Sequence, residues 1–63
     1  MSITILYDRL FNDGSKMEEE HYIYCVDEWD VSLLPDAIAT LYKSFDNKGI
    51  NIKITNIIID RDC

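Results

Sequence analysis

The sequence predicts a small α+β domain of ββαβ type, with a three-stranded, mainly antiparallel sheet and one amphipathic helix packed on one face. Three observations predict this fold. Two segments of alternating apolar residues flank a turn signal, an apolar stripe of helical period follows, and a third alternating segment comes last. Sixty-three residues, 48% of them hydrophobic, allow a single domain spanning residues 1–63.

The first two strands are predicted over residues 2–11 and 19–26. Both alternate apolar and polar side chains and are rich in β-branched and aromatic residues. Residues 12–15 between them form a strong turn signal, because Gly14 can adopt a positive φ. We therefore expect an antiparallel hairpin, whose register stays open because the connection is longer than a two-residue turn.

A helix is predicted over residues 32–48. Asp30 or Ser32 can cap it with a short side-chain oxygen, and Pro35 is tolerated in a first turn, where an N–H has no partner to lose. Gly49 is the expected stop in the left-handed conformation. The apolar stripe that defines the helix consists of Leu34, Ala37, Ile38, Leu41, Tyr42 and Phe45.

The third strand is predicted over residues 50–59, and its pattern breaks where Ile57, Ile58 and Ile59 follow one another. Either a bulge near Asn56 shifts the phase, or both faces of the strand end are covered. A third strand beside either hairpin strand is an edge, and an apolar edge invites pairing. We expect a homodimer formed through these three isoleucines or the uncovered sheet face; the alternative is that Ile57 or Ile59 merely packs under the N-terminal residues.

The residues that could carry catalysis do not converge. His21 and Cys25 share a strand face but lie about 13 Å apart at ~3.3 Å per residue, which excludes a local Cys–His pair or zinc site. Cys25 is expected to be a small buried hydrophobic residue and Cys63 an exposed terminal thiol. Phosphate-binding loops, nucleophile elbows and metalloprotease motifs are absent from the sequence. The sequence thus predicts a non-enzymatic protein without metal or cofactor.

The net charge of −6 is unevenly distributed along the chain. Residues 18–30 hold six acids and neither Lys nor Arg. Such a field repels nucleic acid and anionic membranes and attracts a protein partner with a basic surface. The alternative is a solvated hairpin, with Trp29 closing one end of the core. The candidate partner-binding residues combine these acids with the aromatic side chains that commonly anchor interfaces: Glu18, Glu19, Glu20, Tyr22, Tyr24, Asp27, Glu28, Trp29 and Asp30.

In size, charge and compactness, although in no motif, the chain resembles small acidic inhibitors encoded by phages and mobile elements, such as anti-defence proteins, anti-CRISPR proteins and DNA mimics. The resemblance implies an inhibitor or modulator of a nucleic-acid-handling enzyme. We expect it to act in the cytoplasm, of a host if it is phage-encoded. Two alternatives stay open: an immunity protein against a basic toxin, and an assembly subunit whose Ile-rich third strand completes another protein's sheet.

Overall fold

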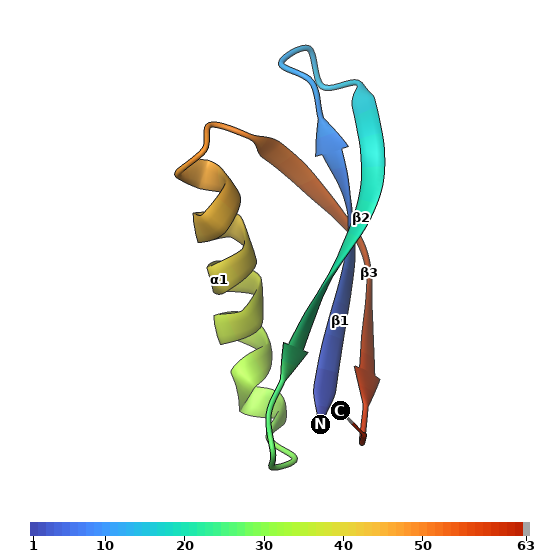
Figure 1. Cartoon of the computed structure of the whole chain (residues 1–63), viewed down its shortest axis with the longest axis vertical. Helices are drawn as coiled ribbons and strands as arrows, with labels where there is room; N and C mark the ends of the chain where they lie inside the picture. Colours follow the sequence, from blue (N-terminus) through green and yellow to red (C-terminus); the bar gives the residue numbers. More distant parts are fainter. Residues whose placement is uncertain (63) are drawn as a thin grey trace.

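A computed structural model describes residues 1–62, and its elements follow the predicted ββαβ order (Figure 1). Strands β1 (Ser2–Leu10), β2 (Lys16–Cys25) and β3 (Asn51–Asp60) form one sheet in the order β2-β1-β3. Helix α1 (Leu34–Asp46) follows a short 3₁₀ turn, η1 (Val31–Leu33). Both strand pairs are antiparallel, and the helix lies along one face of the sheet, which confirms the predicted fold class.

Strand β1 lies at the centre because both of its neighbours supply apolar side chains to the same face. Ile3, Ile5 and Tyr7 point toward the helix and are buried against Ala37 and Leu41. Together with Met1 they form the whole buried apolar core of the described chain. The flanking side chains in register with Ile3 and Ile5 are Tyr24 and Tyr22 on β2, and Ile59 and Ile57 on β3.

The hairpin between β1 and β2 has a bulge, which settles its register. Arg9 lies opposite Glu18 and Leu10 opposite Lys16, so Met17 is the extra residue. Gly14 in the turn has φ +87°, as its position predicts. Strand β2 therefore begins three residues earlier than expected, because the pairing continues past the bulge.

The helix is preceded by a capped 3₁₀ turn. The carboxylate of Asp30 accepts hydrogen bonds from the backbone N–H (3.0 Å) and the hydroxyl (2.6 Å) of Ser32, so Asp30 caps η1, whereas α1 itself begins at Leu34, two residues later than predicted, without a side-chain cap. Pro35 lies in the first turn of α1. The helix ends at Asp46, two residues earlier than predicted, and Gly49 follows with φ +68°.

A bulge in β3 explains the run of three isoleucines. Leu6 pairs with Asn56 and Tyr7 with Ile54, which leaves Thr55 as the extra residue. The hydroxyl of Thr55 donates to the Leu6 carbonyl at 3.2 Å. The bulge near Asn56 is thus confirmed. It restores the phase so that Ile57 and Ile59 lie on the helix side, whereas Ile58 lies on the uncovered face of the sheet.

The two candidate residues for local chemistry, His21 and Cys25, lie on the uncovered sheet face, and both are exposed. The expectation that Cys25 is a small buried hydrophobic residue is therefore wrong: Cys25 ends β2 opposite Ser2, on the face of the sheet that the helix does not cover, and it is disulfide-bonded. The expectation for Cys63 concerns a position outside the described residues.

Candidate functional site

The topology brings the strand and helix ends with most of the net charge to one end of the molecule. β1 begins there, β2 and β3 end there, and α1 begins there (Figure 1, bottom). We call this region the acidic end. Six side-chain carboxylates belong to it, and Arg61 is its one cationic side chain among the described residues, so it holds −5 of the −6 side-chain charge; the ammonium of Met1, which donates to the Val26 carbonyl at 2.8 Å, also lies there. Its carboxylates are those of Asp27, Glu28, Asp30, Asp36, Asp60 and Asp62.

The opposite end, which we call the hairpin end, is nearly neutral. It contains the β1–β2 turn, the end of α1 and the beginning of β3. Its six carboxylates are balanced by five cations, which leaves a net charge of −1. The molecule measures 39 × 19 × 14 Å, so the two ends are separated by most of its long axis. The charged residues at this end are Asp8, Arg9, Asp13, Lys16, Glu18, Glu19, Glu20, Lys43, Asp46, Lys48 and Lys53.

The three consecutive glutamates of β2 are engaged by two cations of the hairpin end. Arg9 Nη1 lies 2.9 Å from Glu18 Oε1, and Arg9 Nε lies 3.4 Å from Glu20 Oε1. Lys16 Nζ donates a hydrogen bond to Glu19, which lowers the pKa of that carboxyl and raises the pKa of the lysine. These acids therefore project much less field than the sequence alone indicates.

The hairpin end also contains an aromatic cluster that positions Arg9. The ring of Phe45 packs edge-on against Tyr7, with centroids 5.4 Å apart. The guanidinium of Arg9 lies 5.8 Å from the centroid of Phe45, within the range of a cation–π contact. Burial, and then the nearby Glu20 carboxylate, raise the pKa of Tyr7. Arg9 thus ties the hairpin to the end of the helix, a structural role.

The predicted anchors Tyr22 and Tyr24 are half-buried on the helix side of β2, packed against the core. Only part of each ring is accessible to a partner, and Tyr24, the next-to-last residue of β2, borders the acidic end while Tyr22 lies two residues further from it. The nine candidate residues are thus not one surface. Glu18 and the end of β2 are about 23 Å apart at ~3.3 Å per residue, so the structure places the glutamates and residues 27–30 at opposite ends.

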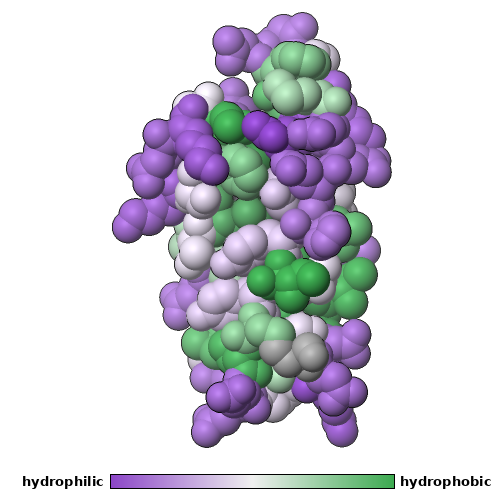
Figure 2. Space-filling model, in the orientation of Figure 1, coloured by the Kyte–Doolittle hydropathy of each residue, from purple (hydrophilic) through white to green (hydrophobic). Residues whose placement is uncertain are grey.

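At the acidic end, apolar side chains lie exposed beside the carboxylates. Trp29 is 57% exposed and Val31 is 54% exposed. Trp29 and Asp27, with Met1 and Arg61, line an open hollow of about 330 Å³. Figure 2 shows hydrophobic atoms beside hydrophilic ones at the lower end of the molecule. The prediction placed Trp29 and its neighbouring acids in one group, and the structure keeps that part of the group together.

Three carboxylates of the acidic end were missed by sequence reasoning: Asp36, Asp60 and Asp62. They are distant along the chain from residues 27–30, and no local pattern connects them. The signal that could have found them is topological. In an antiparallel ββαβ sheet, the end of the second strand, the beginning of the helix and the end of the third strand share one end of the domain.

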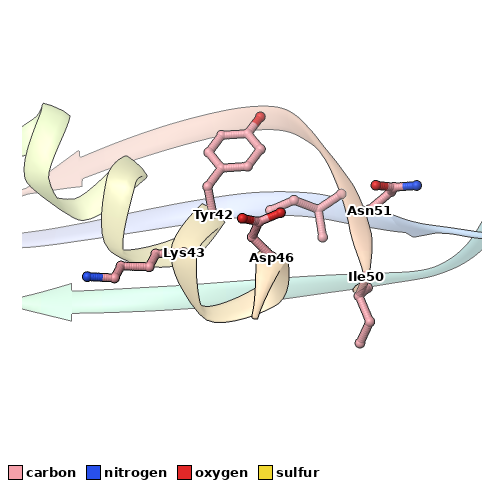
Figure 3. A pocket seen from close by; sticks show the side chains of 6 residues that line it. Tyr42, Lys43, Asp46, Ile50 and Asn51 are labelled. Atoms are coloured by element: carbon pink, nitrogen blue, oxygen red, sulfur yellow. The ribbon is translucent and has the colours of Figure 1, made fainter. Parts of the chain in front are cut away.

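A second hollow, of about 290 Å³, lies between the end of α1 and the beginning of β3 (Figure 3). It is lined from the helix by Tyr42, Lys43 and Asp46, from the connection by Ile50, and from the beginning of β3 by Asn51. Lys43 points away from the Asp46 carboxylate, and Asn51 points away from Ile50. The polar groups do not converge on a common point, so this hollow does not have the geometry of a ligand site.

Comparison with models of known families, with curated proteins and with solved structures finds no match for this chain. Within residues 1–62, no cluster of three or more His, Cys, Asp or Glu side chains could hold a metal ion. Over the same residues, α1 is the longest helix at 13 residues, and no helix has both the length and the apolar character needed to cross a membrane.

Proposed function

We propose that this protein is a non-enzymatic binding protein that uses its acidic end to engage a basic surface of a partner protein and thereby inhibits or modulates that partner. The observation that carries the proposal is the position of the charge: −5 of the −6 lies around an exposed tryptophan. Carboxylates at the rim would accelerate encounter with a cationic surface, and Trp29 would supply the apolar anchor.

The partner class that fits this chemistry best is a nucleic-acid-handling enzyme. Such proteins carry grooves lined with Lys and Arg that neutralise phosphates, and a compact row of carboxylates can occupy the same groove. At the acidic end, the segment after β2, the first turn of α1 and the end of β3 supply carboxylates from three separate parts of the chain. A set of acids presented by three segments, rather than by one flexible tail, has a fixed arrangement that a basic groove could recognise.

The proposal is tested by comparing two double variants with the same change in net charge. Asp27→Asn with Glu28→Gln removes two charges from the acidic end, while Asp30, the cap of η1, stays intact. Asp13→Asn with Asp46→Asn removes two charges from the hairpin end and serves as the control. Each protein is immobilised and exposed to host lysate at low and high salt, and the captured proteins are identified by mass spectrometry.

We expect the unmodified chain and the control to retain the same salt-sensitive partner, and the acidic-end variant to lose it. Circular dichroism must show the same spectrum for all three proteins. Equal capture by both variants would contradict the proposal, because the position of the charge would then be irrelevant. A Trp29→Ala variant separates the apolar anchor from the field: it should weaken binding at high salt as well as at low salt, since apolar contacts are not screened.

A further inference from the structure

The two edges of the sheet differ in a way that bears on self-association. The outer strand β2 carries Lys16 and three glutamates along its length, which is how proteins commonly protect an edge. The outer strand β3 carries no charged side chain between Lys53 and Asp60. Its last half, residues 56–60, is an Asn, three isoleucines and an Asp, and Ile58 is 46% exposed.

We propose that β3 pairs with the β3 strand of a second copy, antiparallel and centred on Ile58, so that two chains form one continuous six-stranded sheet. In this register Ile58 lies opposite Ile58 of the second copy. Ile57 of each copy then lies opposite Ile59 of the other copy. Both of these residues point to the helix side, so their side chains meet on the same face. Cross-strand pairs of β-branched residues are favourable contacts in sheets.

The same register places complementary polar groups together at both ends of the pairing. Asn56 lies opposite Asp60 of the second copy, where the amide can donate to the carboxylate. Within the monomer, Asn56 Oδ1 accepts a hydrogen bond at 2.9 Å from the Ile57 N–H, which faces the free edge, so pairing exchanges this bond for one from the Ile57 N–H to the Ile59 carbonyl of the second copy. The arrangement is two-fold symmetric and sets no charge directly against a like charge.

Other registers with the helices on the same side are less favourable. A shift of two residues in one direction sets Ile59 against the bulged Thr55 of the second copy, where the strand is irregular. A shift of two residues in the other direction sets Asp60 against Ile58 and leaves the carboxylate in an apolar contact. Only the register centred on Ile58 pairs apolar with apolar and polar with polar residues along all five positions.

The bulge limits the length of this pairing and therefore its strength. Five residues per copy cover less than the ~800 Å² per partner of a standard interface, so we expect a weak dimer that depends on concentration. The proposal does not rest on the function proposed for the acidic end, since it uses the edge of β3 and a different partner, although Asp60 belongs to both surfaces.

The test uses two substitutions that are matched in position. Ile58 and Ile23 both lie opposite Thr4 on the uncovered face, one on β3 and the other on β2, and both are about half exposed. Ile58→Lys would set two lysines against each other at the centre of the pairing, whereas Ile23→Lys changes the same face at the other edge. Sedimentation equilibrium over roughly 10 μM to 1 mM protein measures the dissociation constant of the dimer. Disulfide-linked copies are first removed by gel filtration.

We expect the unmodified chain and Ile23→Lys to dimerise alike, and Ile58→Lys to raise the dissociation constant by roughly tenfold or more, because like charges directly opposite destabilise a strand pair. Hydrogen exchange should also slow at the β3 amides as the concentration rises. A monomer over the whole range would overturn the proposal, as would a dimer unaffected by Ile58→Lys. Equal weakening by both substitutions would overturn it too, because the interface would then be the uncovered face.

Discussion

Replacing Ile5 by Ala removes the centre of a very small core. Ile5 has no exposed surface and lies between Tyr22 and Ile57 in the sheet. The substitution deletes three methyl or methylene groups, worth about 2.4 kcal/mol at ~0.8 kcal/mol each. The cavity left behind raises the expected loss of unfolding free energy to about 3–4 kcal/mol. A 63-residue domain has about 3–9 kcal/mol in total, so much of its stability should disappear.

The assay is urea denaturation followed by circular dichroism, with Ile23→Ala as the matched control. Ile23 is the same residue type on the neighbouring strand, but it points to the uncovered face and is 55% exposed. We expect Ile23→Ala to cost less than about 1 kcal/mol, the range of β-propensity and surface effects. Equal losses for the two variants would refute the reasoning, because Ile23 would then be buried in solution as deeply as Ile5.

Three further predictions concern local structure. Lys16→Met should return the pKa of Glu19 toward its ordinary value of 4.5, measured by NMR titration. Because the lysine lowers that pKa, the stability that the pair contributes is present above pH 4.5 and is lost as the pH falls through the pKa of the folded state. An unchanged pKa in the variant would mean that the pair is not formed. Deleting Thr55 should leave a folded domain by circular dichroism, since the bulge residue can be removed without changing which face the residues of either half of β3 occupy. Deleting Lys53 should unfold the domain, because it turns Ile52 away from the core. Equal tolerance of both deletions would contradict the register of β3 against β1. Gly49→Ala should lower the unfolding free energy by about 1–2 kcal/mol, measured in urea, because φ there is +68°, and no loss would show that the left-handed stop does not persist in solution.

The elements of this fold could be predicted because each has a local signal. Alternation identified the strands, the helical stripe identified α1, and Gly49 marked its end. The bulge near Asn56 was also visible, since three consecutive isoleucines cannot all face one side of a regular strand. The beginning of β2 was missed because Lys16 and Glu18 are polar and the one apolar residue between them, Met17, is the bulge, so only their pairing with β1 makes them a strand.

The distribution of charge could not be predicted in the same way, because it depends on the order of the strands. Read along the chain, Glu18, Glu19 and Glu20 belong to the same acidic run as residues 27–30. In space, Arg9 lies across the hairpin from Glu18 and Glu20, while Lys16 lies beside Glu19 on the same strand. Lys16 is a neighbour of the acidic run in the sequence, whereas only the antiparallel register brings Arg9 beside it. The surface position of Cys25 also depends on the tertiary fold, since the single helix covers the other face of the sheet.

The two proposed interfaces meet at the acidic end, and this gives them opposite dependence on salt. Ile58 lies two residues from Asp60, so pairing through β3 would bring two acidic ends to the same region of the dimer. In the proposed register the two Asp60 positions are offset by about 13 Å along the strands, so their repulsion acts at about 0.01 M salt, where the screening length is about 30 Å, and is largely screened at physiological ionic strength, where that length is about 8 Å. Raising the salt from about 0.01 M to the physiological range should therefore strengthen the dimer, while it weakens the contact with a basic partner. The dissociation constants of the dimer and of the partner complex, measured on the same protein against salt concentration, should therefore change in opposite directions. A change in the same direction would mean that one of the two surfaces has been wrongly assigned.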